Sequence, residues 1–200
     1  MNMQEAFQNC GTDKKLHGYL PFYEDAFKDY QNTAKTVLEI GVHEGASLVG
    51  WRNYFPNARI IGIEINNSVI KLRNKDRVNI HVGDATNKNF MRDIISKYPK
   101  GFDIVIDDGS HHSHDIRRAF AILWPHTNYV YCVEDLATQY SENDFPNRVK
   151  RKFGNQFITQ GTYAKNMHKY VDQMMESPYL REDIFKVSFY KWQIYIYKNK

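Results

Sequence analysis

The stretch FDIVIDDGSH at positions 102–111 has the pattern of a buried β-strand that ends in two acids and is followed by a histidine. One strand further along, VYCVED at positions 130–135 is again an apolar run that ends in acids. In an open parallel sheet, ligands bind in the crevice outside the carboxyl ends of the strands. We therefore expect the acids and the histidine at these two strand ends to lie together: Asp108, His111, Glu134 and Asp135.

Short apolar, β-rich runs alternate with amphipathic stretches over the first two thirds of the chain. The expected strands are 36–40, 58–64, 78–82, 102–107 and 129–134. The expected helices are 47–54, 68–74, 88–95 and 114–123. Parallel neighbours need crossover connections of about a dozen residues, so the alternation predicts a Rossmann-like, doubly wound, mostly parallel α/β sheet. The apolar runs 184–190 and 193–198 predict a C-terminal antiparallel hairpin.

The 200 residues have ordinary apolar (42%) and charged (25%) content, which predicts a single domain with one core. Within it, residues 1–35 are expected to form an N-terminal lid and helix segment, and residues 136–177 an acceptor loop with a helix near 163–175. The start of the chain lacks a signal-peptide pattern, and no run approaches the roughly 20 apolar residues of a membrane helix, so we expect no membrane association. Cys10 and Cys132 are far apart in sequence, which favours free thiols and a cytoplasmic protein.

The net charge of +4 is small, and acids and bases are mixed along the chain, which disfavours a nucleic-acid partner. The exception is the basic run Arg148–Lys152. Such a run is usually a solvated surface, but its place after the acidic strand end would suit an anionic acceptor such as a nucleotide-linked sugar or an acidic glycan. The apolar pattern does not decide between a monomer and a symmetric homo-oligomer.

The first strand leads into the turn LEIGVHEGAS at positions 38–47, which has two glycines and a serine in the N-cap position of the next helix. His43 stands where a dinucleotide-binding turn has its second glycine, which normally admits a pyrophosphate. The turn therefore disfavours a dinucleotide and suits S-adenosylmethionine, which has no phosphates. The candidate cofactor-binding residues of the turn are Glu39, Gly41, Gly45 and Ser47.

Two further acids follow strand ends and extend the candidate cofactor site. Glu64 ends the second strand, where a carboxylate can accept hydrogen bonds from both ribose hydroxyls. Asp84 follows the third strand, where it could read the adenine amino group, and Ala85 leaves room for the ring. A single strand-terminal acid often only caps a turn, so the assignment rests on Glu39, Glu64 and Asp84 in register.

These residues resemble the class I S-adenosylmethionine-dependent O-methyltransferases, and among them the metal-dependent macrolide-sugar methyltransferases of the mycinamicin and demethylmacrocin type. The similar segments are Gly11–Lys14 with His17 and Tyr19, 38–42 with 44–45, Trp51 with 54–56, 62–64, 107–111 and 134–136. The resemblance implies that Mg²⁺ is held by three acids and that His111 is the general base. Those acids are Asp108, Glu134 and Asp135. It also places Lys14 near the mouth of the site, although from the sequence alone Asp13–Lys15 is an ordinary exposed turn.

The chemistry of these side chains supports the same interpretation. Three carboxylates without cysteine form a hard oxygen set that suits Mg²⁺ better than a structural zinc. A divalent cation lowers the pKa of a coordinated hydroxyl, and His111, with an ordinary pKa near 6.5, can then accept its proton near neutral pH. Asp107 is left out of the metal set, because successive strand residues point to opposite faces. His112 and His114 are interpreted as the polar start of a helix.

The main hypothesis is a Mg²⁺-dependent O-methyltransferase that acts on a hydroxyl of a sugar, a sugar-bearing small molecule or a glycan. A second hypothesis keeps the fold and the metal but takes a catechol-like aromatic diol, for which Tyr140 and Phe145 would offer stacking surface. A third is a non-catalytic nucleoside- or RNA-binding module that uses the basic run. Such a module does not need the acids and His111 together. Trp51, Phe55 and Trp124 are expected in the core rather than in a site.

Overall fold

The computed structural model describes residues 1–70, 76–135, 158–160, 183–190 and 193–199. Its helices are α1 (Met3–Ala6), α2 (Leu20–Phe27), α3 (Ala46–Tyr54), α4 (Lys88–Lys97) and α5 (Ser113–Leu123), with short 3₁₀ turns η1 (Asp13–Lys15), η2 (Lys28–Tyr30), η3 (Asn67–Val69) and η4 (Trp124–His126). Its strands are β1 (Thr36–Ile40), β2 (Arg59–Glu64), β3 (Val78–Val82), β4 (Phe102–Asp107), β5 (Thr127–Val133), β6 (Ile158–Gln160), β7 (Ile184–Tyr190) and β8 (Gln193–Lys198).

The strands form one sheet in the order β3-β2-β1-β4-β5-β8-β7-β6. The pairs among β1 to β5 are parallel, whereas β8 pairs antiparallel with both β5 and β7. The predicted Rossmann-like sheet with its C-terminal hairpin is therefore confirmed. The short strand β6, which pairs parallel with β7, was not predicted. The helix predicted over 68–74 is a 3₁₀ turn in its described part, and the predicted acceptor loop and helix fall almost wholly outside the described residues.

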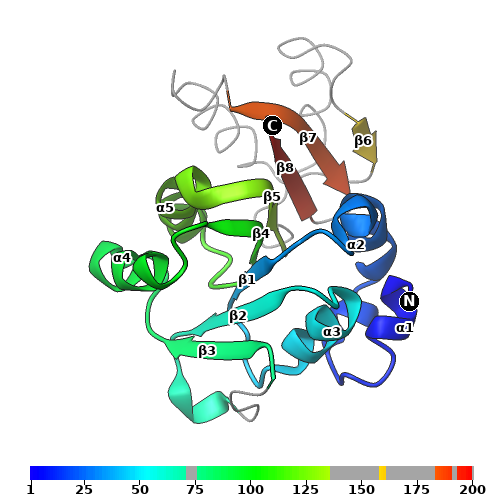
Figure 1. The fold of residues 1–200 in the computed structure, drawn as a ribbon, viewed down its shortest axis with the longest axis horizontal. Coiled ribbons are helices and arrows are strands. Elements are labelled where there is room, and N and C mark those ends of the chain that lie inside the picture. Colours follow the sequence, from blue (N-terminus) through cyan, green and yellow to red (C-terminus); the bar gives the residue numbers. More distant parts are fainter. Residues whose placement is uncertain (71–75, 136–157, 161–182, 191–192, 200) are drawn as a thin grey trace.

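Helices cover both faces of the sheet, with α4 and α5 on one side and α1, α2 and α3 on the other (Figure 1). Strand residues alternate between the two layers because the side-chain period of a strand is 2. In β1, Val37 packs into the cluster with α1 to α3, and its neighbour Leu38 packs into the cluster with α4 and α5. The inner strands are therefore mostly apolar on both faces, as expected of a parallel sheet.

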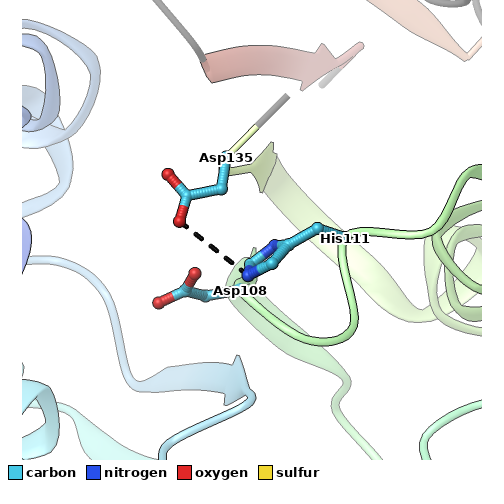
Figure 2. A group of neighbouring side chains, drawn as sticks. All are labelled: Asp108, His111 and Asp135. Atoms are coloured by element: carbon cyan, nitrogen blue, oxygen red, sulfur yellow. Dashed lines mark ion pairs between the residues drawn. The ribbon is translucent and has the colours of Figure 1, made fainter. Parts of the chain in front are cut away.

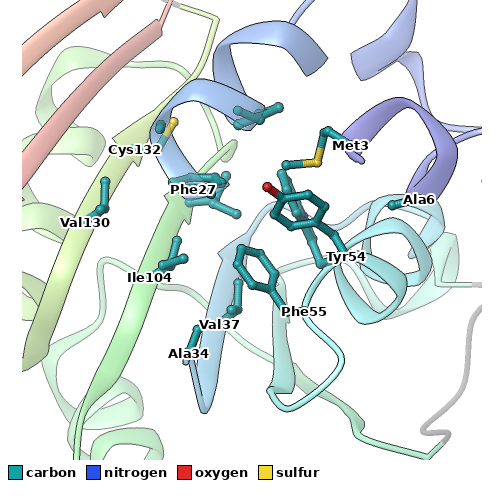
Figure 3. Close-up of a cluster of buried hydrophobic side chains, with 14 of the residues drawn as sticks. Met3, Ala6, Phe27, Ala34, Val37, Tyr54, Phe55, Ile104, Val130 and Cys132 are labelled. Atoms are coloured by element: carbon teal, nitrogen blue, oxygen red, sulfur yellow. The ribbon is translucent and has the colours of Figure 1, made fainter. Parts of the chain in front are cut away.

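The N-terminal segment is anchored by an aromatic cluster on the α1 to α3 face (Figure 3). Trp51 of α3 is fully buried, with the ring of Phe7 at 4.7 Å and that of Tyr23 at 4.9 Å, both edge-on. Such pairs contribute about 0.5–1.5 kcal/mol each beyond their area burial. Trp51, Phe55 and Trp124 are all 0% exposed, so their prediction as core residues is confirmed. The cluster holds residues 1–30 against the sheet.

The carboxyl ends of β1, β4 and β5 lie side by side, and the residues that follow them stay in register. The backbone amide of Asp108 donates to the carbonyl of Ile40 at 3.0 Å, and that of Glu134 donates to the carbonyl of Asp107 at 2.9 Å. The acids after the strands are thus held by the same ladder that builds the sheet. Among the described residues, no helix is both long and apolar enough to cross a membrane. Cys10 and Cys132 are free thiols.

Candidate functional site

A cavity of about 700 Å³ opens at the carboxyl ends of the parallel strands. The turn after β1, the ends of β2 and β3, the loop after β4, Asp135 after β5 and the N-terminal segment all contribute to its walls. Most of the predicted site residues line it: Gly41, Ser47, Glu64, Asp84, Asp108, His111 and Asp135. Three do not contribute to its lining: Glu39, Gly45 and Glu134. The two strand-end acids of these three are fully buried behind the wall.

The turn after β1 differs from its prediction at the start of α3. Gly45, not Ser47, is the N-cap residue, with a φ of 89°. The chain must pass through the left-handed region there, which glycine enters without steric cost. Ser47 lies one residue inside the helix, and its hydroxyl donates to Glu39 Oε2 at 2.6 Å. The N-cap prediction for Ser47 is therefore wrong, and the hydroxyl instead helps to hold a buried acid.

Glu64 and Asp84 reach the cavity with part of their hydrogen-bonding capacity already used. The oxygens of Glu64 accept from the backbone amides of His43 at 2.8 Å and Asn66 at 2.9 Å. Asp84 Oδ1 accepts from the amide of Thr86 at 2.7 Å and from its hydroxyl at 2.8 Å. Each carboxylate oxygen has two lone pairs, so both acids retain acceptor sites for a ligand. The amide contacts fix their orientation.

Asp108, His111 and Asp135 form a group that faces the cavity (Figure 2). One possible ligand atom from each lies within 4.8 Å of the others. His111 Nε2 is 3.8 Å from Asp135 Oδ2, and the two side chains are 29% and 26% exposed. Carboxylate and imidazole donors at this spacing can hold a divalent cation or pass a proton. The predicted proximity of these three residues is therefore confirmed.

Glu134 does not line the cavity, and it lies with Asp108 and Glu39 around the ammonium of Lys14. The Lys14 ammonium Nζ is 2.6 Å from Asp108 Oδ2, 2.9 and 3.0 Å from the two oxygens of Glu134, and 3.1 Å from Glu39 Oε1. Lys14 is 1% exposed, so the prediction of an ordinary exposed turn at this position is wrong. Its burial is possible because three carboxylates surround the charge.

Burial shifts the protonation equilibria of this group. Burial alone would lower the pKa of Lys14, but the charges of Asp108, Glu134 and Glu39 outweigh it and raise that pKa well above its ordinary value. Burial raises the pKa of Asp108 to about 6, although Lys14 acts to lower it. Burial also raises the pKa of Glu134, and the Asp108 charge adds to the rise. One ammonium does not neutralise three carboxylates, so the site favours additional positive charge.

Asp107 and Asp108 are separated by the pleat of β4. Asp107 is buried and accepts from the Tyr131 hydroxyl at 3.1 Å, on the α4 and α5 side. Burial raises the pKa of Asp107 to about 7. Asp108 points to the Lys14 side instead. Asp107 does reach the cavity wall, but its hydrogen bond to Tyr131 supports leaving it out of the metal set.

Backbone strain gathers around the cavity. Of the four non-glycine residues with positive φ in the described part of the chain, His43 (48°), His111 (59°) and Asp135 (52°) line the cavity. Such conformations cost roughly 1–3 kcal/mol each and persist where the surrounding structure enforces them. They commonly occur where side chains must be aimed at a ligand.

The donor set fits a hard divalent cation at the cavity. Asp108 and Asp135 offer carboxylate oxygens on the open side, beside His111, and Asp108 has a second oxygen besides the one that Lys14 holds. Both oxygens of Glu134 are bound to Lys14, so this acid would ligate a cation only through its remaining lone pairs. The assignment of Asp108, Glu134 and Asp135 as a complete ligand set stays a prediction.

Comparison with known proteins finds similar chains among macrolide-sugar methyltransferases. The chain is 39% identical over 136 residues to the mycinamicin VI 2''-O-methyltransferase of Micromonospora griseorubida, covering 62% of this chain and 33% of that protein. It is 35% identical over 134 residues to the demethylmacrocin O-methyltransferase of Streptomyces fradiae, with the same coverage of 62% and 33%. No family model matches the chain.

Among solved structures, the chain is similar to the MycE methyltransferase from the mycinamycin biosynthetic pathway, determined in complex with Mg, SAH and mycinamycin VI. The TM-score is 0.77 at 28% sequence identity, and the match covers 100% of this chain and 55% of that one. The chain thus spans about a third of the length of these curated relatives, 33% in both cases. These comparisons confirm the resemblance predicted from the sequence.

Proposed function

We propose that the protein is a divalent-cation-dependent O-methyltransferase that moves the methyl group of S-adenosylmethionine to a hydroxyl of a sugar or sugar-bearing molecule. One observation carries the proposal: Asp108, His111 and Asp135 face a cavity whose wall also carries two of the predicted cofactor acids, Glu64 and Asp84. A cation and a base therefore have a place beside the cofactor. The similarity to MycE, solved with Mg and SAH, supports this choice of cofactor and metal.

Different residues of the cavity wall would bind different parts of the cofactor. Glu64 would accept the ribose hydroxyls, because its carboxylate lies at the end of β2 and is held in place by backbone amides. Asp84 would face the adenine edge from the end of β3. Gly41 allows the turn after β1 to pass close to the loop after β4, because a Cβ at this position would lie 2.0 Å from the carbonyl oxygen of Asp108.

His111 would act as the general base. When bound, the cation would supply Lewis-acid polarisation of the acceptor hydroxyl, and S-adenosylmethionine an activated methyl group whose sulfur departs as a neutral thioether. His111 would accept the hydroxyl proton as the oxygen–carbon bond forms and the carbon–sulfur bond breaks. Asp135, 3.8 Å from His111 Nε2, would favour the imidazolium that results.

The acceptor is proposed to be a sugar hydroxyl because the chain resembles the macrolide-sugar methyltransferases, and the two relatives described above are named for mycinamicin VI and demethylmacrocin. A vicinal diol would offer two oxygens to a cation held by Asp108 and Asp135. The basic run Arg148–Lys152 and the aromatic residues Tyr140 and Phe145 lie outside the described residues. An anionic acceptor and a homo-oligomer thus remain predictions of the sequence.

Binding of the cofactor is the first test. The purified chain is titrated calorimetrically with S-adenosylmethionine and S-adenosylhomocysteine, with Mg²⁺ and again with a chelator. We expect binding in both series, and Asp108→Asn should weaken Mg²⁺ binding while largely sparing the cofactor. Asp93→Asn, which changes an exposed acid of α4, is the matched control. A chain that binds neither nucleoside in either series would overturn the proposal and turn attention to RNA.

The role of His111 is tested by turnover with separate acceptor classes, namely sugar diols and catechols. His111→Gln should retain Mg²⁺ and cofactor binding but lose about two to four orders of magnitude in turnover, the usual contribution of a general base. Methylation of catechols alone would replace the sugar acceptor with an aromatic diol. A His111→Gln variant as active as the parent chain would rule out His111 as the base.

A further inference from the structure

Lys14 connects acids from three different strands. Its ammonium lies within 3.1 Å of a carboxylate oxygen of Glu39, Asp108 and Glu134. Glu39 is the fourth residue of β1, and the other two acids directly follow β4 and β5. These acids share one face of the sheet because they alternate with residues of the α4 and α5 cluster, such as Leu38 and Val133. The N-terminal segment that carries Lys14 covers that same face.

The contacts of Lys14 leave one oxygen of Asp108 available to a ligand in the cavity. Lys14 bonds to Oδ2 of Asp108, and a carboxylate can use its second oxygen for another partner. Asp135 is contacted separately, by the hydroxyl of Tyr19 from the same N-terminal segment. All three acids predicted to hold the cation thus receive a hydrogen bond from one stretch of chain, residues 14–19.

The three buried carboxylates need a positive charge among them. Without the ammonium, Glu39, Asp108 and Glu134 would be neighbouring carboxylates with no positive charge between them, and like charges at this spacing repel strongly at low dielectric. With it, the acids keep fixed positions, and their total charge is still negative enough to attract a divalent cation. Removing one partner from a buried ion pair commonly leaves an uncompensated charge and disturbs the site.

We propose that Lys14 is a positioning residue of the cation site, which fixes Asp108 and Glu134 for the incoming ion and ties the N-terminal segment to the acids. This inference rests on the proposed function, because it assigns a role toward the cation proposed there. The role is distinct from that of a ligand, since an ammonium has no lone pair to donate. It resembles that of outer partners that orient ligands in other metal sites.

The test compares two adjacent lysines. Lys14→Met removes the buried ammonium, whereas Lys15→Met makes the same change at an exposed neighbour outside the cavity wall. Mg²⁺ binding is measured by calorimetry on the full chain, without acceptor, together with the midpoint of thermal unfolding. Lys14→Met should bind Mg²⁺ about 10- to 100-fold more weakly, the usual loss on removing an outer partner of a metal ligand. Lys15→Met should match the parent chain.

A second variant separates positioning from stability. Lys14→Met leaves Glu39 and Glu134 buried without a counter-charge, and this lowers stability for reasons unrelated to the cation. Glu39→Gln removes one of these two charges, so the double variant Lys14→Met/Glu39→Gln should regain part of the lost thermal stability. Its Mg²⁺ binding should stay weak, because Asp108 and Glu134 still lack their holder. A purely structural lysine predicts that stability and Mg²⁺ binding recover together.

The outcomes distinguish the inference from the proposed function. If the parent chain binds Mg²⁺ and the folded double variant binds it equally well or more tightly, the positioning role is overturned and the proposed function stands. If the parent chain binds the cofactor but no Mg²⁺, the cation-dependent function fails, and the role of Lys14 fails with it. Weak Mg²⁺ binding by a stable double variant supports the inference.

Discussion

Two glycines, Gly41 and Gly11, have the same left-handed backbone but different surroundings. Their φ values are 78° and 74°. A Cβ on Gly41 would lie 2.0 Å from the carbonyl oxygen of Asp108, whereas a Cβ on Gly11 would meet nothing within 4 Å. The first glycine therefore serves both a backbone conformation and a close approach of two loops, and the second serves only the conformation.

We expect Gly41→Ala to lower the free energy of unfolding by about 2 kcal/mol more than Gly11→Ala does. Both variants strain the backbone, but only the first forces the β4 loop away, and overpacking of this kind costs roughly 1–3 kcal/mol. Urea unfolding of the two variants measures the difference. Equal losses would show that the turn after β1 can shift away from Asp108 without cost.

At the scale of elements, Arg77 joins the start of β3 to the end of α3. Its guanidinium donates to the carbonyls of Phe55 and Ala58 at 2.9 Å each and to that of Arg52 at 3.0 Å. The last carbonyls of a helix lack partners within the helix, and a cation there also interacts favourably with the helix dipole. Arg77 therefore fixes the end of α3 and the loop before β2.

Arg77→Met should destabilise the chain by about 2 kcal/mol or more, because a hydrogen bond to a charged group contributes roughly 1.5–3 kcal/mol and three carbonyls lose their donor. Chemical denaturation provides the measurement. The control is Arg59→Met, which changes an exposed arginine at the start of β2. The assignment of Arg77 as the cap of α3 would be wrong if both variants had the parent stability.

At the scale of the whole molecule, the stability depends on pH through groups that act in opposite directions. Burial, with a smaller effect of Lys97, lowers the pKa of His81 below its ordinary value of 6.5, and its ring contacts the Tyr98 hydroxyl at 3.1 Å. As pH falls through about 6.5, the unfolded chain therefore binds a proton that folded His81 resists, and stability is lost. Asp107 and Asp108, with raised pKa values of about 7 and about 6, bind protons more readily when folded and gain stability over that range.

The variant His81→Gln separates the contribution of His81 to the pH dependence of stability from that of the carboxylates. The stability of the parent chain relative to His81→Gln should decrease as pH falls from 8 to 5, because only the parent has the histidine to protonate. Urea midpoints of both chains across this range measure the difference, and the carboxylate effects cancel in the comparison. A constant difference would mean that His81 titrates equally in the folded and unfolded chains.

The local sequence pattern was enough to predict most of the sheet and the part of the site that faces the cavity. The expected strands 36–40, 78–82 and 102–107 match β1, β3 and β4, because an apolar run bounded by turns has few alternatives. The rule that parallel strands end at one edge then brought Asp108, His111 and Asp135 together. The prediction of Ser47 as the N-cap residue is wrong, because α3 already begins at Ala46, after Gly45 in the left-handed conformation.

The sequence by itself determined the alternating strands and helices, the edge at which their acids gather and the chemical character of those acids, since period and residue type are local properties. Only the tertiary structure decided which of these acids contact Lys14 and which line the cavity. Lys14 lies 94 residues from Asp108 and 120 from Glu134, and no local period relates positions so far apart. Burying its charge required three strands and an N-terminal segment to meet, because an ammonium is stable in the interior only where carboxylates surround it.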